Sequence, residues 1–305
     1  MKLLTNKNKV YTLLLLSTGA FALWTCSSIS LVPQNDLYVS SDELIEVDAT
    51  TTPDNGYKSP DKREGWDMVW TDEFGVPEID TTKWNYEVNG SGMGNEELQY
   101  YVSSRANSYI RDGKLVLKAM QQNYKGKFYT SARLNSRYKG DWKYGRMDIR
   151  AKLPVQQGIW PAIWMLPTDY VYGTWPQSGE IDIMEVIGQK ANTTHGTIHF
   201  GQPWPNNKWI GEQKVLSKGD FSDEFHVFSV EWEENQIRWY LDDTLFCKRV
   251  PTDVQPQRWP FDQRFHMILN LAIGGNWPGP PDENTKFPKY MYVDYVRVYQ
   301  KNELK

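Results

Sequence analysis

Short runs of alternating hydrophobic and polar residues dominate the chain from Trp66 onward. Examples are "GRMDIRAKL", "FHMILNLAIGG" and "YMYVDYVRVYQ", which are rich in β-branched and aromatic residues and are separated by Gly, Pro, Asn and Asp. A period of two residues indicates strands, and no long apolar stripe with a helical period appears. The sequence therefore predicts an all-β domain built as a sandwich of antiparallel sheets.

One stretch also indicates how its predicted strands are connected. In "VEWEENQIRWYLDDTLF", two alternating runs are joined through Glu234-Asn235, and a second pair of turn residues follows at Asp242-Asp243. Asn and Asp tolerate the left-handed backbone conformation that tight hairpin turns require. We therefore expect a hairpin here, followed by a second turn.

The residues before the domain have a different composition. Lys2, Lys7 and Lys9 flank the start of a 15-residue, mostly apolar stretch, "VYTLLLLSTGAFALW". That stretch is short for a membrane span, which needs about 20 residues, and is typical of a secretory signal. Residues 27 to 64 are polar and rich in Ser, Thr, Pro and Asp, as in a flexible tether. We predict a signal peptide over residues 1–25, a tether over 26–64 and a folded domain over 65–301.

The end of the apolar stretch, "ALWTCSS", resembles a bacterial lipobox with Cys26 as the lipidated residue. The alternative is a Cys26–Cys247 disulfide in a secreted chain. We favour the lipoprotein because Cys26 adjoins the apolar segment and lies far from any core strand. The expected location is outside the cytoplasm, anchored to a membrane through that lipid, at the bacterial cell surface or facing the periplasm.

Composition restricts the partners further. The formal net charge of -4 and the pI near 5.7 argue against a nucleic-acid-binding protein, which normally carries a basic excess. The 14 Trp, 18 Tyr and 11 Phe are compatible with a large β core. They are equally compatible with a groove of flat, amphipathic rings, a surface that suits sugars.

The segment "SGEIDIMEVIG" (178–188) carries three acids within six residues, Glu180, Asp182 and Glu185. In a strand, Glu180 and Asp182 project from the same face, but Glu185 breaks the two-residue period. A regular strand would place Glu185 among the isoleucines on the other face, where an unpaired carboxylate is costly.

One extra residue near Met184, a β-bulge, would return Glu185 to the face of the other two acids. Ile181 and Ile183 should then face the core and Glu185 a cleft. Carboxylates gathered on one face repel one another, so at least one pKa should be raised.

A pair of carboxyl groups, one ionised and one protonated, is what glycoside hydrolysis requires. Metal binding by the three acids stays open as well, although Ca²⁺ usually takes its ligands from loops. A solvated outer strand face, with no chemical role for the acids, stays open too. The neighbouring segments "GIWPAIWMLP" and "GTWPQSGE" favour a catalytic site over a plain surface.

The same segments carry a resemblance to a known family. "GIWPAIWMLP", "WPQSGEIDIMEVIG", "HGTIHFG" and "LAIGGNWPGPPD" resemble the signature segments of glycoside hydrolase family 16, in its laminarinase and endo-β-1,3(4)-glucanase branch. The resemblance covers about residues 65 to 300. It implies a β-jelly-roll sandwich of two curved antiparallel sheets, with a sugar-binding cleft on the concave face. It also implies an endo-acting, retaining hydrolase of β-1,3 or mixed-linkage β-1,3/1,4 glucans.

Position by position, the resemblance implies that Glu180 is the nucleophile and Glu185 the acid/base. Asp182 would tune protonation and orient the nucleophile. The E-x-D-x-x-E spacing disfavours branches of the family that use a regular E-x-D-x-E strand on other polysaccharides. A non-catalytic glucan-binding protein remains the main alternative.

The resemblance also implies sugar-binding residues. The cleft tryptophans would be Trp160, Trp164 and Trp175, and the histidine that faces the acids would be His199. A glycine-rich loop (89 to 101) would contribute the polar residues Asn89 and Asn95, and the two lesser candidates are Arg133 and Trp277. In that loop, Met93 stands where the family often has a Trp. His195 is left unassigned.

No cofactor is expected for catalysis. Many family members carry a structural calcium, which here would involve Asp294, with Glu73 and Gly113 contributing main-chain oxygens. The expected partner is a β-glucan chain, bound by a monomer. Transglycosylation differs only in the acceptor that enters the cleft and stays open.

Overall fold

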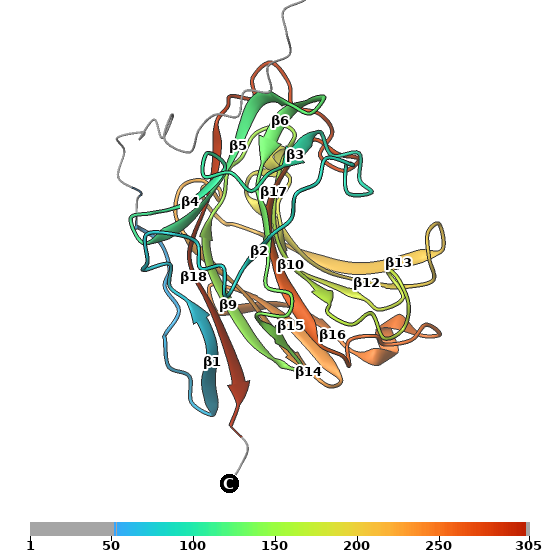
Figure 1. The fold of residues 1–305 in the computed structure, drawn as a ribbon. Coiled ribbons are helices and arrows are strands. Elements are labelled where there is room, and N and C mark those ends of the chain that lie inside the picture. Colours follow the sequence, from blue (N-terminus) through green and yellow to red (C-terminus); the bar gives the residue numbers. More distant parts are fainter. Residues whose placement is uncertain (1–51, 53, 303–305) are drawn as a thin grey trace, which may run out of the picture. The chain divides into compact units, whose positions relative to one another are not determined.

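The computed structural model describes residue 52 and residues 54–302. Strands dominate these residues, with two short 3₁₀ turns, η1 (Gly188–Lys190) and η2 (Pro251–Val254). The strands form a ten-stranded and an eight-stranded sheet, in which most neighbours are antiparallel. Figure 1 shows them as the two layers of a sandwich. The predicted all-β sandwich is confirmed.

The larger sheet has a continuous path of eight strands and two strands off it. In spatial order the path is β16 (Thr244–Arg249), β15 (Gln236–Leu241), β14 (His226–Glu233), β9 (Gly145–Lys152), β18 (Lys289–Lys301), β5 (Lys114–Tyr124), β6 (Lys127–Ser131) and β3 (Gln99–Tyr101). β1 (Trp66–Asp72) pairs with β18, and β4 (Ser108–Arg111) pairs with β5.

The smaller sheet has a path of seven strands and one strand off it. In spatial order the path is β13 (Asn207–Val215), β12 (Thr193–Gly201), β11 (Glu180–Glu185), β10 (Ile159–Pro167), β17 (Phe265–Ile273), β7 (Arg133–Asn135) and β2 (Asn85–Tyr86). β8 (Asp141–Trp142) pairs with β17.

The expected hairpin is present as β14 and β15, which are joined through Glu234-Asn235. The second turn joins β15 to β16 at Asp242 and Asp243, whose φ angles of 50° and 59° are left-handed. Asp enters this conformation more readily than most residues. The two side chains are bound from elsewhere in the fold, Asp242 by the amide of Val227 and Asp243 by Arg63.

The core lies between the two sheets. Aliphatic residues of β11 and aromatic residues of β14 belong to the same buried cluster, so the inner faces of the two sheets pack on each other. The outer face of β11 is thereby left for its acids.

Part of the predicted tether packs on the larger sheet. The amide of Tyr57 donates to the carbonyl of Phe225 at 3.1 Å, and the carbonyl of Tyr57 accepts from the Arg150 side chain at 2.7 Å. The folded domain therefore begins before residue 65, and the predicted boundary lies too late in the chain.

Cys26 and the predicted signal lie outside the described residues, within which no helix is both long and apolar enough to span a membrane. Cys247 is a buried free thiol on β16.

Candidate active site

A cavity of about 960 Å³ lies on the outer face of the smaller sheet and crosses its strands from β7 to β13. Aromatic, acidic and amide side chains form much of its lining. Among them are Asn95, Glu97, Arg133, Trp160, Trp164, Trp175, Glu180, Asp182, Glu185, His195, His199, Trp204, Asn207, Trp209, Asn270 and Trp277. The three acids of "SGEIDIMEVIG" thus face a cleft.

The predicted bulge is present in β11. Opposite β12, Asp182 pairs with Thr197 and Glu185 with His195, so three residue steps on β11 match two on β12. The extra residue sends Ile183 and Met184, which are consecutive, into the core. Glu185 is thereby returned to the cleft face.

The bulge is held from the opposite sheet. Trp239 of β15 is fully buried, and its indole N–H donates to the carbonyl of Asp182 at 2.7 Å. Gly196 of β12 makes room for that ring, because a Cβ there would lie 2.6 Å from Trp239 Cδ1. The bulge interrupts the regular pairing of β11 beside Asp182, so this bond satisfies a buried carbonyl at the irregularity.

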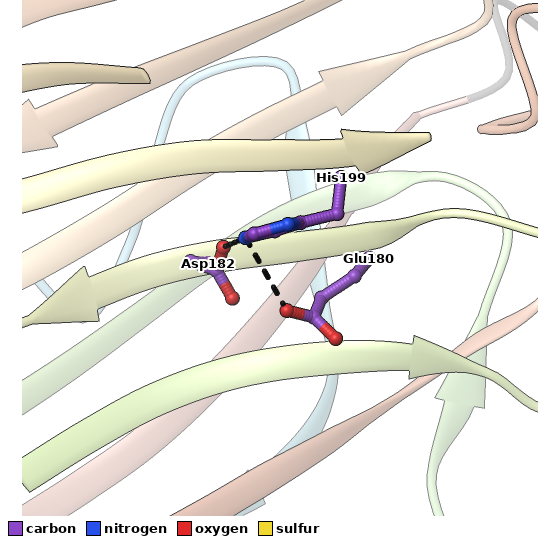
Figure 2. A group of neighbouring side chains, drawn as sticks. All are labelled: Glu180, Asp182 and His199. Atoms are coloured by element: carbon purple, nitrogen blue, oxygen red, sulfur yellow. Dashed lines mark ion pairs between the residues drawn. The ribbon is translucent and has the colours of Figure 1, made fainter. Parts of the chain in front are cut away.

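Glu180 is held by two nitrogen groups. The indole N–H of Trp175 donates to its Oε2 at 2.9 Å, and His199 Nε2 lies 3.6 Å from its Oε1. His199 Nε2 also lies 3.2 Å from Asp182 Oδ2, so the imidazole bridges the two acids (Figure 2). Both partners of Glu180 favour its ionised form.

Glu185 has a poorer set of partners. The indole N–H of Trp160 donates to its Oε1 at 3.1 Å. Burial, and then the charge of Asp182, raise the pKa of Glu185 well above its ordinary value. The same two causes raise the pKa of Glu180 to about 8. The predicted rise in pKa is confirmed for both carboxyls.

Burial alone would lower the pKa of His199, but the charges of Glu180, Asp182 and Glu185 outweigh it and raise the pKa to about 10. The imidazole is therefore protonated at neutral pH. The carboxyls and the imidazolium lie close enough for the charge of each to affect the protonation of the others. Glu180 has two nitrogen partners that favour its carboxylate and Glu185 has one, and a cleft with two carboxyls in such different surroundings is equipped for general acid and nucleophilic chemistry.

The predicted tryptophans form two groups around the acids. Trp160 and Trp277 meet edge to face with ring centroids 5.6 Å apart. Trp164 donates its N–H to Asn270 Oδ1 at 2.7 Å, and the Arg133 guanidinium lies 4.7 Å from its ring centroid. These rings therefore have fixed positions in the cleft wall.

Asn95 lines the cleft as expected, but Asn89 is not among the residues that line it. The Asn89 side-chain oxygen accepts from the backbone N–H of Ser91 at 2.6 Å, and its backbone pairs with Tyr101. The Asn89 side chain therefore shapes the turn of this loop.

Several cleft residues were not predicted from the sequence. His195 packs against Trp277 with ring centroids 5.1 Å apart, and burial lowers its pKa. Asn270 links Trp164 to the hydroxyl of Tyr101. Trp204 and Trp209 lie at the β13 end of the cavity. In the sequence, their one signal is a pair of Trp residues within the polar stretch "GQPWPNNKWIGEQ".

Within the described part of the chain, the acids and histidines that gather closely enough for a metal are Glu180, Asp182 and His199, with ligand atoms within 4.8 Å of one another. The same atoms form the ion pairs described above. His199 would have to be deprotonated before it could bind a metal.

Two cationic side chains lie beside Asp294, the aspartate predicted to bind calcium. The carboxylate of Asp294 accepts from Arg150 Nη1 at 2.8 Å and lies 3.7 Å from Lys114 Nζ. Calcium needs six to eight oxygen ligands, and here two cations already neutralise the aspartate.

Comparison with known proteins agrees with this geometry. The model of the glycosyl hydrolases family 16 matches residues 95–297. A β-glucanase of Rhodothermus marinus is 44% identical over 260 residues, which cover 80% of this chain and 89% of that protein. A glucan endo-1,3-β-glucosidase A1 of Niallia circulans is 42% identical over 86% of this chain, which spans only 41% of that relative.

The laminarinase catalytic domain from Thermotoga maritima has a similar structure, with a TM-score of 0.73 and 40% identity over 79% of this chain and all of that domain. The fold shared with such laminarinases confirms the predicted jelly-roll sandwich. With a family match over most of the domain and the acid-bearing strand in the cleft, this chain belongs to the glycosyl hydrolases family 16.

Proposed function

We propose that the chain is an endo-acting, retaining β-glucanase that hydrolyses internal β-1,3 bonds, or β-1,4 bonds in mixed-linkage β-1,3/1,4 glucans. The observation that carries this proposal is the bulged strand β11, which places Glu180 and Glu185 in one open cleft with different partners. An open cleft that crosses the sheet suits attack within a long chain.

The reaction would proceed by double displacement. A carboxylate oxygen of Glu180 attacks the anomeric carbon, the bond from that carbon to the leaving oxygen breaks, and Glu185 gives its proton to that oxygen. Water then attacks the same carbon, Glu185 takes the proton of the water, and the bond to Glu180 breaks. Two inversions return the original β configuration.

The neighbouring groups support these two assignments. The N–H of Trp175 and the imidazolium of His199 stabilise Glu180 as a carboxylate. Burial keeps Glu185 protonated until the leaving oxygen needs its proton. Asp182 is the carboxylate closer to His199 and holds that ring in place.

Release of reducing ends from laminarin and from lichenan tests the proposal. The parent should release them and Glu180→Gln should not, while both are retarded in a glucan-containing gel. A parent that is retarded but releases nothing would instead be a non-catalytic glucan-binding protein. The ratio of the two activities gives the linkage preference.

The location and the anchor form a separate proposal. The apolar N-terminal stretch and the lipobox-like "ALWTCSS" support export and lipidation at Cys26. A monomer anchored in this way would act on glucan outside the cytoplasm. Labelled palmitate should be incorporated into the parent and not into Cys26→Ser, and the variant should leave the membrane fraction.

A further inference from the structure

Two tryptophans at the β13 end of the cavity take no part in the catalytic cluster. Trp204 and Trp209 are 78% and 66% exposed, and both line the cavity. Among the described residues, no aromatic ring packs against either indole. Leaving two large apolar rings in water on one face is costly unless a ligand covers them.

Strand pairing places Trp209 in register with the catalytic residues. Glu180 pairs with His199 on β12, and His199 pairs with Trp209 on β13. Directly paired residues project from the same face, so the three side chains form one row across the cleft. Two strand spacings separate Trp209 from Glu180, roughly 10 Å between backbones. A sugar on that indole is therefore remote from the bond that is cleaved.

Strand β13 is braced by contacts beside Trp209, and the next position on its cleft face carries no side chain. Ile210 packs against the core, and Arg249 of β16 donates to the carbonyl of Gly211 at 2.9 Å, which braces the edge strand β13. Gly211 is the next residue on the cleft face, and a Cβ there would lie 2.6 Å from Thr197 Oγ1. The absence of a side chain leaves the floor open beside the indole.

We propose that Trp209, together with Trp204, forms an outlying platform that stacks a glucosyl residue of the polysaccharide away from the cleaved bond. The proposal rests on the proposed function and extends it to chain-length selection. Flat indoles suit the apolar face of a pyranose ring, and Asn207, which also lines this end, offers an amide for its hydroxyls. The platform should raise kcat/KM for long chains only, because short chains do not reach it.

The test is a length series of β-1,3-gluco-oligosaccharides from the triose to the heptaose. In the parent, kcat/KM should rise with length. In Trp209→Ala, the ratio of kcat/KM for the heptaose to that for the triose should fall about tenfold, and Trp209→Phe, which keeps a flat ring, should recover part of it. Phe128→Ala is the matched control, because Phe128 is 70% exposed and lies outside this cavity.

Two results would overturn the platform. One is a ratio in Trp209→Ala equal to that of the parent. The other is an equal loss on every length, which would mean that the ring supports the catalytic residues. A parent that releases no reducing ends refutes the proposed function instead. The platform is then judged by gel retardation in laminarin, where Trp209→Ala should migrate faster than the parent and Phe128→Ala should not.

Discussion

At the scale of single residues, the proposed nucleophile and the proposed acid are distinguished by the groups that bind their carboxyls. Glu180 accepts from Trp175 and faces the His199 imidazolium, whereas Glu185 accepts from Trp160 alone. Replacing Glu185 by Ala should lower kcat on laminarin by about 10²–10⁴-fold. The loss should be far smaller on an aryl glucoside, whose leaving group needs no proton.

Azide distinguishes the two roles further. It should rescue Glu180→Ala with formation of an α-glycosyl azide, and Glu185→Ala with formation of a β-glycosyl azide, both visible by NMR. If the two anomers are exchanged between the variants, the assignment of nucleophile and acid must be reversed.

The charge of His199 makes a prediction about pH. The imidazolium lowers the pKa values of Glu180 and Glu185, while burial and Asp182 raise them. Replacing His199 by Gln removes the lowering contribution, so both carboxyl pKa values should rise. The nucleophile then needs a higher pH to ionise, and the acidic limb of kcat/KM against pH should move upward. An acidic limb that stays in place or moves down would contradict an imidazolium beside these acids.

At the scale of elements, the bulge in β11 determines which residues face the core. Met184 is fully buried because the extra residue sends it inward beside Ile183. Met184→Ala should therefore lower the free energy of unfolding by about 2–5 kcal/mol, as for other core truncations. Met184→Leu should cost little, since it conserves volume. Urea unfolding of the two variants provides the measurement. In a regular strand, residue 184 would face the cleft, and an equal, small effect of both variants would support that register.

The strand pattern and the bulge could be predicted because both follow from local periodicity and from the cost of burying a carboxylate. Trp209 and Asn270 could not be found in this way. Their places in the cleft depend on β13 lying beside β12 and on β17 lying beside β10, pairings between distant segments that periodicity does not encode. Asn89 was wrongly assigned to the cleft because sequence alone does not distinguish a ligand-binding amide from one that caps a turn.

At the scale of the whole domain, the segment before β1 is part of the fold. Arg150 is fully buried under it, and its guanidinium donates to the carbonyls of Asp54, Asn55 and Tyr57. The same guanidinium pairs with Asp294 of β18. One arginine therefore ties the incoming chain to the larger sheet, while the cleft lies on the outer face of the smaller sheet.

The same contacts predict that stability does not depend on calcium. Arg150 and Lys114 already neutralise Asp294, so a second cation would meet their repulsion without gaining a free carboxylate. The thermal midpoint of the parent should be the same in millimolar calcium and in EDTA. Arg150→Met is the contrasting variant, because it leaves Asp294 with Lys114 as its one cationic partner and should lower the free energy of unfolding by about 3–5 kcal/mol. A parent whose midpoint rises by several degrees in calcium would mean that Arg150 and Lys114 give way to the ion, and that Asp294 is a calcium ligand after all.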